Sequence, residues 1–115
     1  MLIRIDPGSS VPLFEQLAAS VRAEIVRGSV VPGERLPSAR DLAESLELNV
    51  HTVLRGYQVV RDEGLIELRR GRGAVVTDRA RDYAALAELL PQFVAEAKRL
   101  GLSPAALAAL IREAY

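Results

Sequence analysis

The chain has 115 residues, of which half are hydrophobic but only 4% aromatic, and it contains no cysteine. This length suits one domain, or one domain with a small appendage, around an aliphatic core. Without cysteine there is no disulfide framework and no thiolate metal site, which is consistent with a reducing cytosol. The N-terminus is too polar and too short for a signal peptide, and no apolar run approaches the roughly 20 residues that span a bilayer. We therefore expect a soluble, cytoplasmic protein without a membrane partner.

Fifteen lysine and arginine residues balance fifteen aspartate and glutamate residues, so the chain is formally neutral. Proteins that bind nucleic acid are often basic, because neutralising phosphates releases counterions, and the balance argues mildly against such a partner. The positive charges are nevertheless clustered near two predicted elements. The clustered arginines are Arg35, Arg40, Arg69, Arg70 and Arg72. This arrangement predicts weak non-specific binding to nucleic acid, with recognition depending on base contacts and dimerisation.

The first predicted helix runs from about Pro12 to Arg27, with Gly28 as its left-handed stop. Its buried stripe recurs every three to four residues. The stripe consists of Leu13, Leu17, Val21 and Ile25, with Phe14 and Ala18 beside it. Before this helix, residues 2–5 alternate enough to form a short strand or a flap. After it, residues 29–37 form a connector whose prolines and glycine favour turns.

Two short helices follow across a tight turn, over about residues 38–46 and 50–63. Ser38 and Asn49 stand where their side chains can accept free N–H groups in the first turn of each helix. Gly64 ends the second helix. The residues expected on the packed faces are Leu42, Ala43 and Leu46 in the first helix and Val53, Leu54, Tyr57 and Val60 in the second.

The opposite face of the second short helix carries polar side chains without a partner in the predicted core. His51, Thr52 and Arg55 form this cluster, at positions i, i+1 and i+4. A short capped helix with polar side chains projecting from its first turns has the shape that enters a DNA major groove.

A strand hairpin is predicted next, from strands at 65–69 and 74–77, and its tip reads Arg70-Gly71-Arg72-Gly73. Glycine pairs close many hairpins, so the tip alone does not indicate a function. Two short helices followed by a hairpin are typical of a winged helix-turn-helix. The expected fold class is therefore mainly α with a small β-wing, followed by two C-terminal helices.

The run from Val11 to Thr77 resembles the DNA-binding domain of the GntR family of bacterial transcription regulators. The matching segments, in the family's order and spacing, are Pro12-Leu13-Phe14-Glu15-Gln16-Leu17, Pro32-Gly33-Glu34-Arg35-Leu36-Pro37-Ser38, Arg40-Asp41-Leu42-Ala43, Asn49, Thr52-Val53, Tyr57 and Gly71-Arg72-Gly73. The resemblance implies a DNA-binding domain over residues 11–79, with its helix-turn-helix at about 39–58 and its wing at about 65–77.

Within this domain the resemblance and the polar pattern together give a set of candidate DNA-binding residues. These are Arg35, Ser38, Arg40, Asn49, His51, Thr52, Arg55, Arg70, Gly71, Arg72 and Gly73. The resemblance places Arg40 at a major-groove contact, although Arg40 could instead pair with Glu44 one turn along the helix. His51 is a candidate groove-facing donor, and Thr52 can reach a phosphate or a thymine methyl group. Arg55 is expected on a phosphate.

The remaining candidates have simpler alternatives. Ser38 can cap its helix and also donate to a phosphate, whereas Asn49 is expected mainly as a cap. Arg35 could contact the DNA backbone or only cover the core with its aliphatic stem. In the wing, the glycines let the backbone approach the minor groove, and Arg70 and Arg72 can enter that groove or hold its phosphates.

Residues 80–115 are predicted to form two helices, and they resemble the dimerisation tail of the YtrA-like subfamily. The first helix is broken or bent at Pro91 and stops at Gly101, and Ser103-Pro104 begins the second. The apolar faces are too wide to cover each other, so a two-fold dimer is expected to bury the remainder. The alternative is that the tail folds back on the winged domain. The residues expected in the dimer interface are Tyr83, Leu86, Leu90, Phe93, Val94, Leu107, Leu110 and Ile111.

These features favour a homodimeric, sequence-specific transcriptional regulator of double-stranded DNA, most simply a repressor. It would bind an inverted repeat with half-sites about 34 Å apart. The resemblance implies control of a neighbouring operon, with transporter genes as the subfamily's usual targets. A winged helix used for protein contacts is the alternative, which the wing arginines disfavour.

Enzymatic activity is not expected, because the chain offers no nucleophile–base pair, no paired catalytic carboxylates and no loop that cradles a phosphate. The single histidine, His51, provides neither a metal site nor a catalytic base, and no cofactor is expected. The residues after the wing are too few for a separate effector-binding domain. A small-molecule effector would therefore use a crevice at the dimer interface or between the tail and the winged domain.

Overall fold

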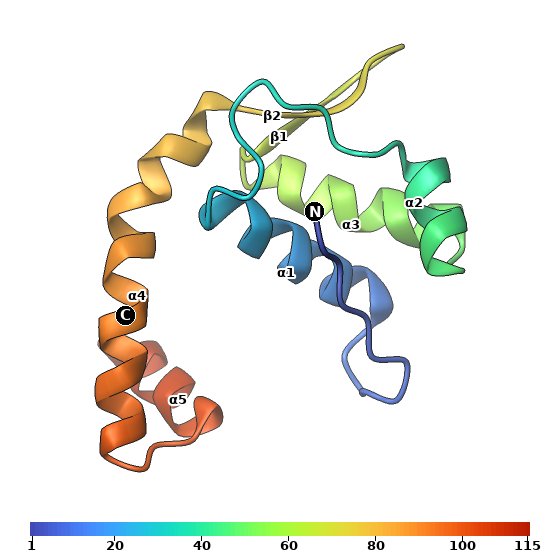
Figure 1. Cartoon of the computed structure of the whole chain (residues 1–115). Coiled ribbons are helices and arrows are strands. Elements are labelled where there is room, and N and C mark those ends of the chain that lie inside the picture. Colours follow the sequence, from blue (N-terminus) through green and yellow to red (C-terminus); the bar gives the residue numbers. More distant parts are fainter. The chain divides into compact units, whose positions relative to one another are not determined.

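Three α-helices and a β-hairpin form the first part of the chain (Figure 1). The structure is a computed structural model that describes residues 1–115, and it divides into two units, Met1–Ala84 and Ala85–Tyr115. The first unit contains α1 (Leu13–Val26), α2 (Ala39–Leu46), α3 (Val50–Asp62), β1 (Ile66–Arg69), β2 (Gly73–Val76) and the 3-10 helix η1 (Asp78–Tyr83). The predicted fold class, mainly α with a small β-wing, is confirmed.

Both predicted helix caps are present in the helix-turn-helix. The Oγ atom of Ser38 accepts the N–H group of Asp41 at 3.0 Å, and the Oδ1 atom of Asn49 accepts that of His51 at 2.8 Å. Each bond satisfies an N–H group that has no partner inside its own helix. The turn between α2 and α3 passes through Glu47, whose φ of 57° lies in the left-handed region. The caps and this turn set the directions in which α2 and α3 leave the connection.

The core of the first unit lies largely between α1 and α3. Its fully buried members on these helices include Leu17, Val21, Ile25, Val53, Tyr57 and Val60. The helices approach closely at Gly56, where a Cβ atom would lie 2.8 Å from Cδ2 of Leu17. The expected burial of Leu54 is wrong, because its side chain is 37% exposed and Gly56 takes its place in the buried face. Leu54 instead lines a cleft between the start of α2 and the hairpin.

The hairpin is antiparallel, and the connector before α2 pairs with it as well. In the register of the strands, Ile66 lies opposite Val76. Backbone bonds join the connector to β2: Gly33 N–H donates to Val76 O at 2.8 Å, and Leu36 N–H donates to Ala74 O at 2.9 Å. The wing is therefore fixed along both edges of β2, while its tip extends beyond these bonds (Figure 1).

Residues 2–5, before α1, were predicted to form a short strand or a flap, and they do not form a strand. Residues 2–5 have no regular secondary structure and lie along α1. The N–H group of Arg4 donates to Oγ of Ser20 at 3.2 Å, and that of Asp6 donates to Oε1 of Gln16 at 2.7 Å. The side chains of Ser20 and Gln16 thus accept backbone N–H groups that would bond to a partner strand if the segment were part of a sheet.

The second unit is built from two further helices, α4 (Ala84–Arg99) and α5 (Pro104–Ala114). The helix predicted to break or bend at Pro91 is continuous there, so a break is excluded. Gly101 follows α4 with a φ of 74°, and Oγ of Ser103 accepts the N–H group of Ala106 at 3.1 Å to cap α5, as predicted. None of the helices combines the length and the apolar character that crossing a bilayer requires.

Candidate nucleic-acid interface

The first two turns of α3 present polar side chains to the surface. His51 and Arg55 are exposed and lie one helical turn apart, and Thr52 between them is partly exposed. Asn49 is also exposed, and its side chain is engaged in the cap of α3. The structure brings these four candidates together at one end of the helix.

Arg40 is exposed in the first turn of α2, close in sequence to the cap residue Ser38. It forms no ion pair, so the alternative of a pair with Glu44 is not realised. An exposed guanidinium that has no carboxylate partner can form two parallel hydrogen bonds to a guanine edge or to a phosphate.

Ion pairing separates the candidate arginines from most others in the chain. The arginines that pair with a carboxylate are Arg22, Arg27, Arg61, Arg69, Arg81 and Arg99. The candidate arginines without such a pair are Arg35, Arg40, Arg55, Arg70 and Arg72; Arg4, Arg79 and Arg112 also have none. A guanidinium without a carboxylate partner keeps its charge for an external anion. The wing therefore carries a net positive charge on a neutral chain, and Arg40 and Arg55 each add an unpaired positive charge on the helix-turn-helix.

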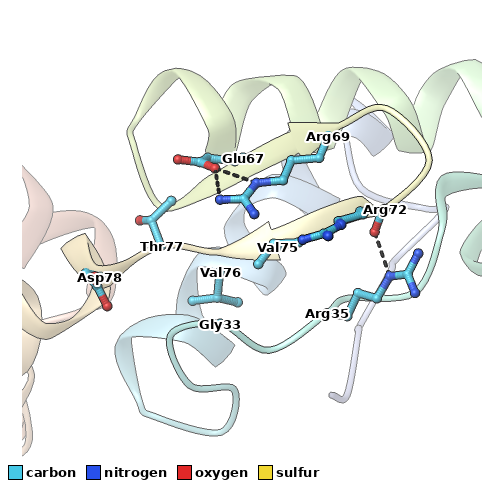
Figure 2. A pocket seen from close by; sticks show the side chains of 9 residues that line it. All are labelled: Gly33, Arg35, Glu67, Arg69, Arg72, Val75, Val76, Thr77 and Asp78. Atoms are coloured by element: carbon cyan, nitrogen blue, oxygen red, sulfur yellow. Dashed lines mark hydrogen bonds and ion pairs between the residues drawn. The ribbon is translucent and has the colours of Figure 1, made fainter.

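Arg35 holds the tip of the wing from the connector. Its Nε atom donates to the carbonyl oxygen of Arg72 at 2.6 Å, and its Nη2 atom donates to that of Gly71 at 3.3 Å. Figure 2 shows the first of these bonds beside the turn of the hairpin. Both predicted alternatives for Arg35, a DNA backbone contact and a cover for the core, omitted this attachment. Gly71 and Gly73 both have positive φ values, 78° and 71°, which the tight tip requires.

A shallow groove of about 460 Å³ runs along the outer side of the hairpin and carries charges of both signs (Figure 2). The Nη2 atom of Arg69 lies 2.6 Å from Oε2 of Glu67. The side chain of Arg72 lies in the same groove without a carboxylate partner. The net positive charge of the wing therefore comes from Arg70 and Arg72, with Arg69 largely neutralised by its neighbour.

Arg55 has a partner that the sequence did not indicate. Its guanidinium carbon lies 3.8 Å from the centre of the Phe14 ring, in the first turn of α1. This distance is well within the range of a cation–π interaction. Phe14 was expected only beside the buried stripe of its helix, and nothing in the local pattern links residues 14 and 55.

Tyr57 connects α3 to the connector before α2. Its buried hydroxyl donates to the carbonyl oxygen of Pro37 at 2.6 Å, and burial raises its pKa well above the ordinary value. The hydroxyl thus remains a neutral donor at physiological pH. Because Pro37 precedes the cap residue Ser38, this bond fixes the start of α2 relative to α3.

The candidate dimerisation residues divide between the two units. Tyr83 ends η1 in the first unit and packs against the core of that unit, so it does not continue the apolar row of α4. In the second unit the candidates are largely exposed, for example Leu86 at 54% and Phe93 at 47%. The remaining candidates of that unit are Leu90, Val94, Leu107, Leu110 and Ile111. An apolar groove of about 300 Å³ lies between α4 and α5, and Phe93, Leu110 and Ile111 line it.

The structure contains no group of histidine, cysteine or acidic side chains arranged to hold a metal ion. Its distinguishing features are a capped helix-turn-helix, a hairpin attached to the connector, and exposed arginines without carboxylate partners. Together they define a winged helix-turn-helix protein of the DNA-binding class.

Comparison with known proteins places the chain within that class. Residues 13–76 match the family described as bacterial regulatory proteins, gntR family. The HTH-type transcriptional repressor YtrA of Bacillus subtilis (strain 168) is 33% identical, over 97% of this chain and 91% of the relative. The chain therefore belongs to the GntR family, and it is a DNA-binding transcriptional regulator.

Solved structures agree with this assignment. YtrA from Sulfolobus acidocaldarius, a GntR-family transcription factor, is 36% identical with a TM-score of 0.63, covering 76% of this chain and 99% of that structure. A GntR family transcriptional regulator from Listeria monocytogenes is 29% identical with a TM-score of 0.62, covering 91% and 96%. Both similarities cover most of this chain.

Proposed function

We propose that the chain is a homodimeric repressor that binds an inverted repeat in double-stranded DNA, with half-sites about 34 Å apart. Its similarity to a protein named as a repressor supports the direction of control. The natural target is the promoter of a neighbouring operon, such as one for a transporter. The protein would act in the cytoplasm, where bacterial chromosomal DNA lies.

In this proposal the first turns of α3 enter the major groove. His51 and Thr52 contact base edges or thymine methyl groups, and Arg40 contacts a guanine or a phosphate from α2. Ser38 and Asn49 keep the two helices in the required directions through their caps. The observation that carries the proposal is the concentration of exposed, unpaired arginines on the helix-turn-helix and the wing.

The wing supplies a second contact beside the recognition helix. Arg70 and Arg72 extend to the phosphates or the floor of the adjacent minor groove, and Gly71 and Gly73 allow the backbone to come close. Arg35 supports this contact by holding the tip from the connector.

Binding to duplex DNA as a function of salt tests these contacts. Against a duplex selected from a random library by the wild-type chain, Arg40→Ala should lose about 1–3 kcal/mol of discrimination between bases. Arg72→Ala should weaken binding to all duplexes and lower the slope of log affinity against log salt by about 0.9. Arg61→Ala is the matched control on α3, because Arg61 already pairs with Asp62 at 3.2 Å.

If Arg40→Ala bound the selected duplex as tightly as the wild type, the groove assignment would be wrong. If the wild type and all three variants failed to bind duplex DNA at low salt, the winged domain would instead be a site for binding other proteins.

The dimer in this proposal forms through the exposed apolar rows of α4 and α5. Leu86, Leu90, Phe93 and Val94 recur on one side of α4, and burying such a row against a second copy removes it from water. Sedimentation equilibrium tests this: Leu90→Glu should shift the wild-type dimer towards monomer, whereas Gln92→Glu should not. A monomeric wild type at micromolar concentration would contradict the assignment.

Control by a small molecule would operate at the same interface. A ligand in a crevice of the dimer would change the spacing of the two recognition helices and thereby the affinity for the repeat. Footprints on the chain's own promoter region, recorded with and without candidate ligands, test this. A footprint that no ligand changes would remove the effector from the proposal.

A further inference from the structure

The stacking of Arg55 on Phe14 is not explained by the needs of the core. Phe14 is only partly buried, and the exposed guanidinium of Arg55 lies 3.8 Å from its ring centre. No carboxylate pairs with Arg55. The aromatic ring therefore holds the cation in place without neutralising it.

This arrangement differs chemically from that of a paired arginine such as Arg69. In the wing, Glu67 both positions and neutralises Arg69. A phenyl ring engages only the flat face of a guanidinium, so the N–H groups around its edge stay available as donors. Those edge donors match the oxygen atoms of a phosphate. Arg55 is thus positioned and still able to bind an anion.

The position of the stack on α3 suggests which part of the DNA it meets. Arg55 lies one turn after His51 and is held against α1, whereas Leu54 borders the cleft that leads to the hairpin. Both α1 and β1 pack on α3, which lies between α1 and the hairpin in Figure 1. A helix in the major groove has a phosphate backbone on each side. The wing and the stacked Arg55–Phe14 pair can therefore face the two phosphate backbones on opposite sides of the major groove.

We propose that Phe14 is a positioning residue that holds Arg55 against the phosphate backbone on the α1 side of the recognition helix. This inference rests on the proposed binding of α3 in the major groove. It adds a contact on the side of α3 away from the wing, in which α1 takes part through Phe14.

The test measures binding of the full chain to a mixed-sequence duplex over a range of salt concentrations. Arg55→Gln should lower the slope of log affinity against log salt by about 0.9, the value for one lost phosphate contact. Phe14→Leu keeps the apolar bulk but removes the ring, and it should weaken binding about two- to fivefold. Phe14→Tyr keeps the ring face and should bind like the wild type.

A double-mutant cycle separates positioning from a general effect on the fold. In the Arg55→Gln background, Phe14→Leu should cause no further loss, because the group that it positions is absent. Urea unfolding of each variant shows whether the fold persists. If Phe14→Leu is too unstable to measure, Phe14→Tyr and Arg55→Gln still decide the matter, since each has its own required result.

An additive loss in the Arg55→Gln background would overturn the inference, and so would an unchanged salt slope for Arg55→Gln. A weak Phe14→Tyr variant would overturn it as well. A failure of the proposed function looks different, because the wild type itself would then show no salt-dependent binding to the duplex.

Discussion

The attachment of Arg35 to the wing predicts that its removal loosens the tip without unfolding the domain. Arg35→Ala removes both side-chain bonds, to the carbonyl oxygens of Arg72 at 2.6 Å and of Gly71 at 3.3 Å. Backbone pairing of the connector with β2 is unaffected, because it uses main-chain atoms only. A hydrogen bond to a charged group is worth about 1.5–3 kcal/mol when it is shielded from water. Because Arg35 is exposed, we expect Arg35→Ala to lower the free energy of opening the tip by about 1 kcal/mol. This corresponds to about a fivefold rise in the fraction of molecules with an open tip.

Amide hydrogen exchange measures this opening directly. The N–H group of Arg72 donates to Arg69 O at 3.0 Å and should exchange about fivefold faster in Arg35→Ala. The N–H group of Thr77, bonded to Leu65 O at 3.0 Å, reports on the base of the hairpin and should be unchanged. Equal acceleration at both amides would show that the whole hairpin had loosened and would refute the local attachment.

DNA binding then distinguishes a support from a direct contact. If Arg35 acts through the wing, Arg35→Ala should cost much less in the Arg72→Ala background than in the wild type. Fully additive losses would mean that Arg35 contacts the DNA independently of the tip.

Other substitutions test the helix packing, a cap and a buried carboxylate. Gly56→Ala should destabilise the fold by about 1–3 kcal/mol in urea unfolding, because α1 leaves no room for a Cβ atom; unchanged stability would contradict this close approach. Ser38→Ala should cost about 1 kcal/mol and Ser38→Thr much less, and equal losses would exclude the cap as the cause. Burial alone would raise the pKa of Glu24, but hydrogen bonding from Ser29 and the charge of Arg27 hold that pKa below its ordinary value. Ionised Glu24 therefore stabilises the fold above the ordinary carboxyl pKa, and this contribution is lost as pH falls through the lowered folded value. The stability difference between wild type and Glu24→Gln should accordingly shrink on acidification, and a difference independent of pH would contradict the assignment.

Local chemistry made the helix-turn-helix predictable. Ser38 and Asn49 accept the N–H groups that their positions implied, and Gly64 follows α3 with the positive φ expected of a helix stop. These signals need only a few neighbouring residues, so they can be recognised without knowledge of the tertiary fold. The wing followed from its strand pattern and glycine-rich tip in the same way.

Contacts between distant segments could not be predicted. The stack of Arg55 on Phe14 joins α3 to α1, and the bond from Arg35 to Arg72 joins the connector to the wing across 37 positions of the sequence. Neither leaves a periodic trace in the sequence. The error at Leu54 has the same origin, because only the close approach of α1 at Gly56 decides which side of α3 is buried.

The tail illustrates a further limit of local patterns. Its apolar periodicity identified α4 and α5, but Tyr83, which fits the same spacing, lies in η1 and packs on the core of the first unit. Periodicity shows that an apolar side chain needs cover but not which surface provides it. Burial of the exposed apolar residues of α4 and α5 in a dimer interface therefore stays a prediction.

Hydroxyl-radical footprinting on a duplex selected by the wild-type chain, combined with the stoichiometry of the complex, tests the proposed mode of binding most directly. Two copies of the chain per duplex should protect two symmetric segments whose centres are about 34 Å apart, and His51→Ala together with Arg40→Ala should abolish both. One copy per duplex, a single protected segment, or protection that survives the double substitution would contradict it.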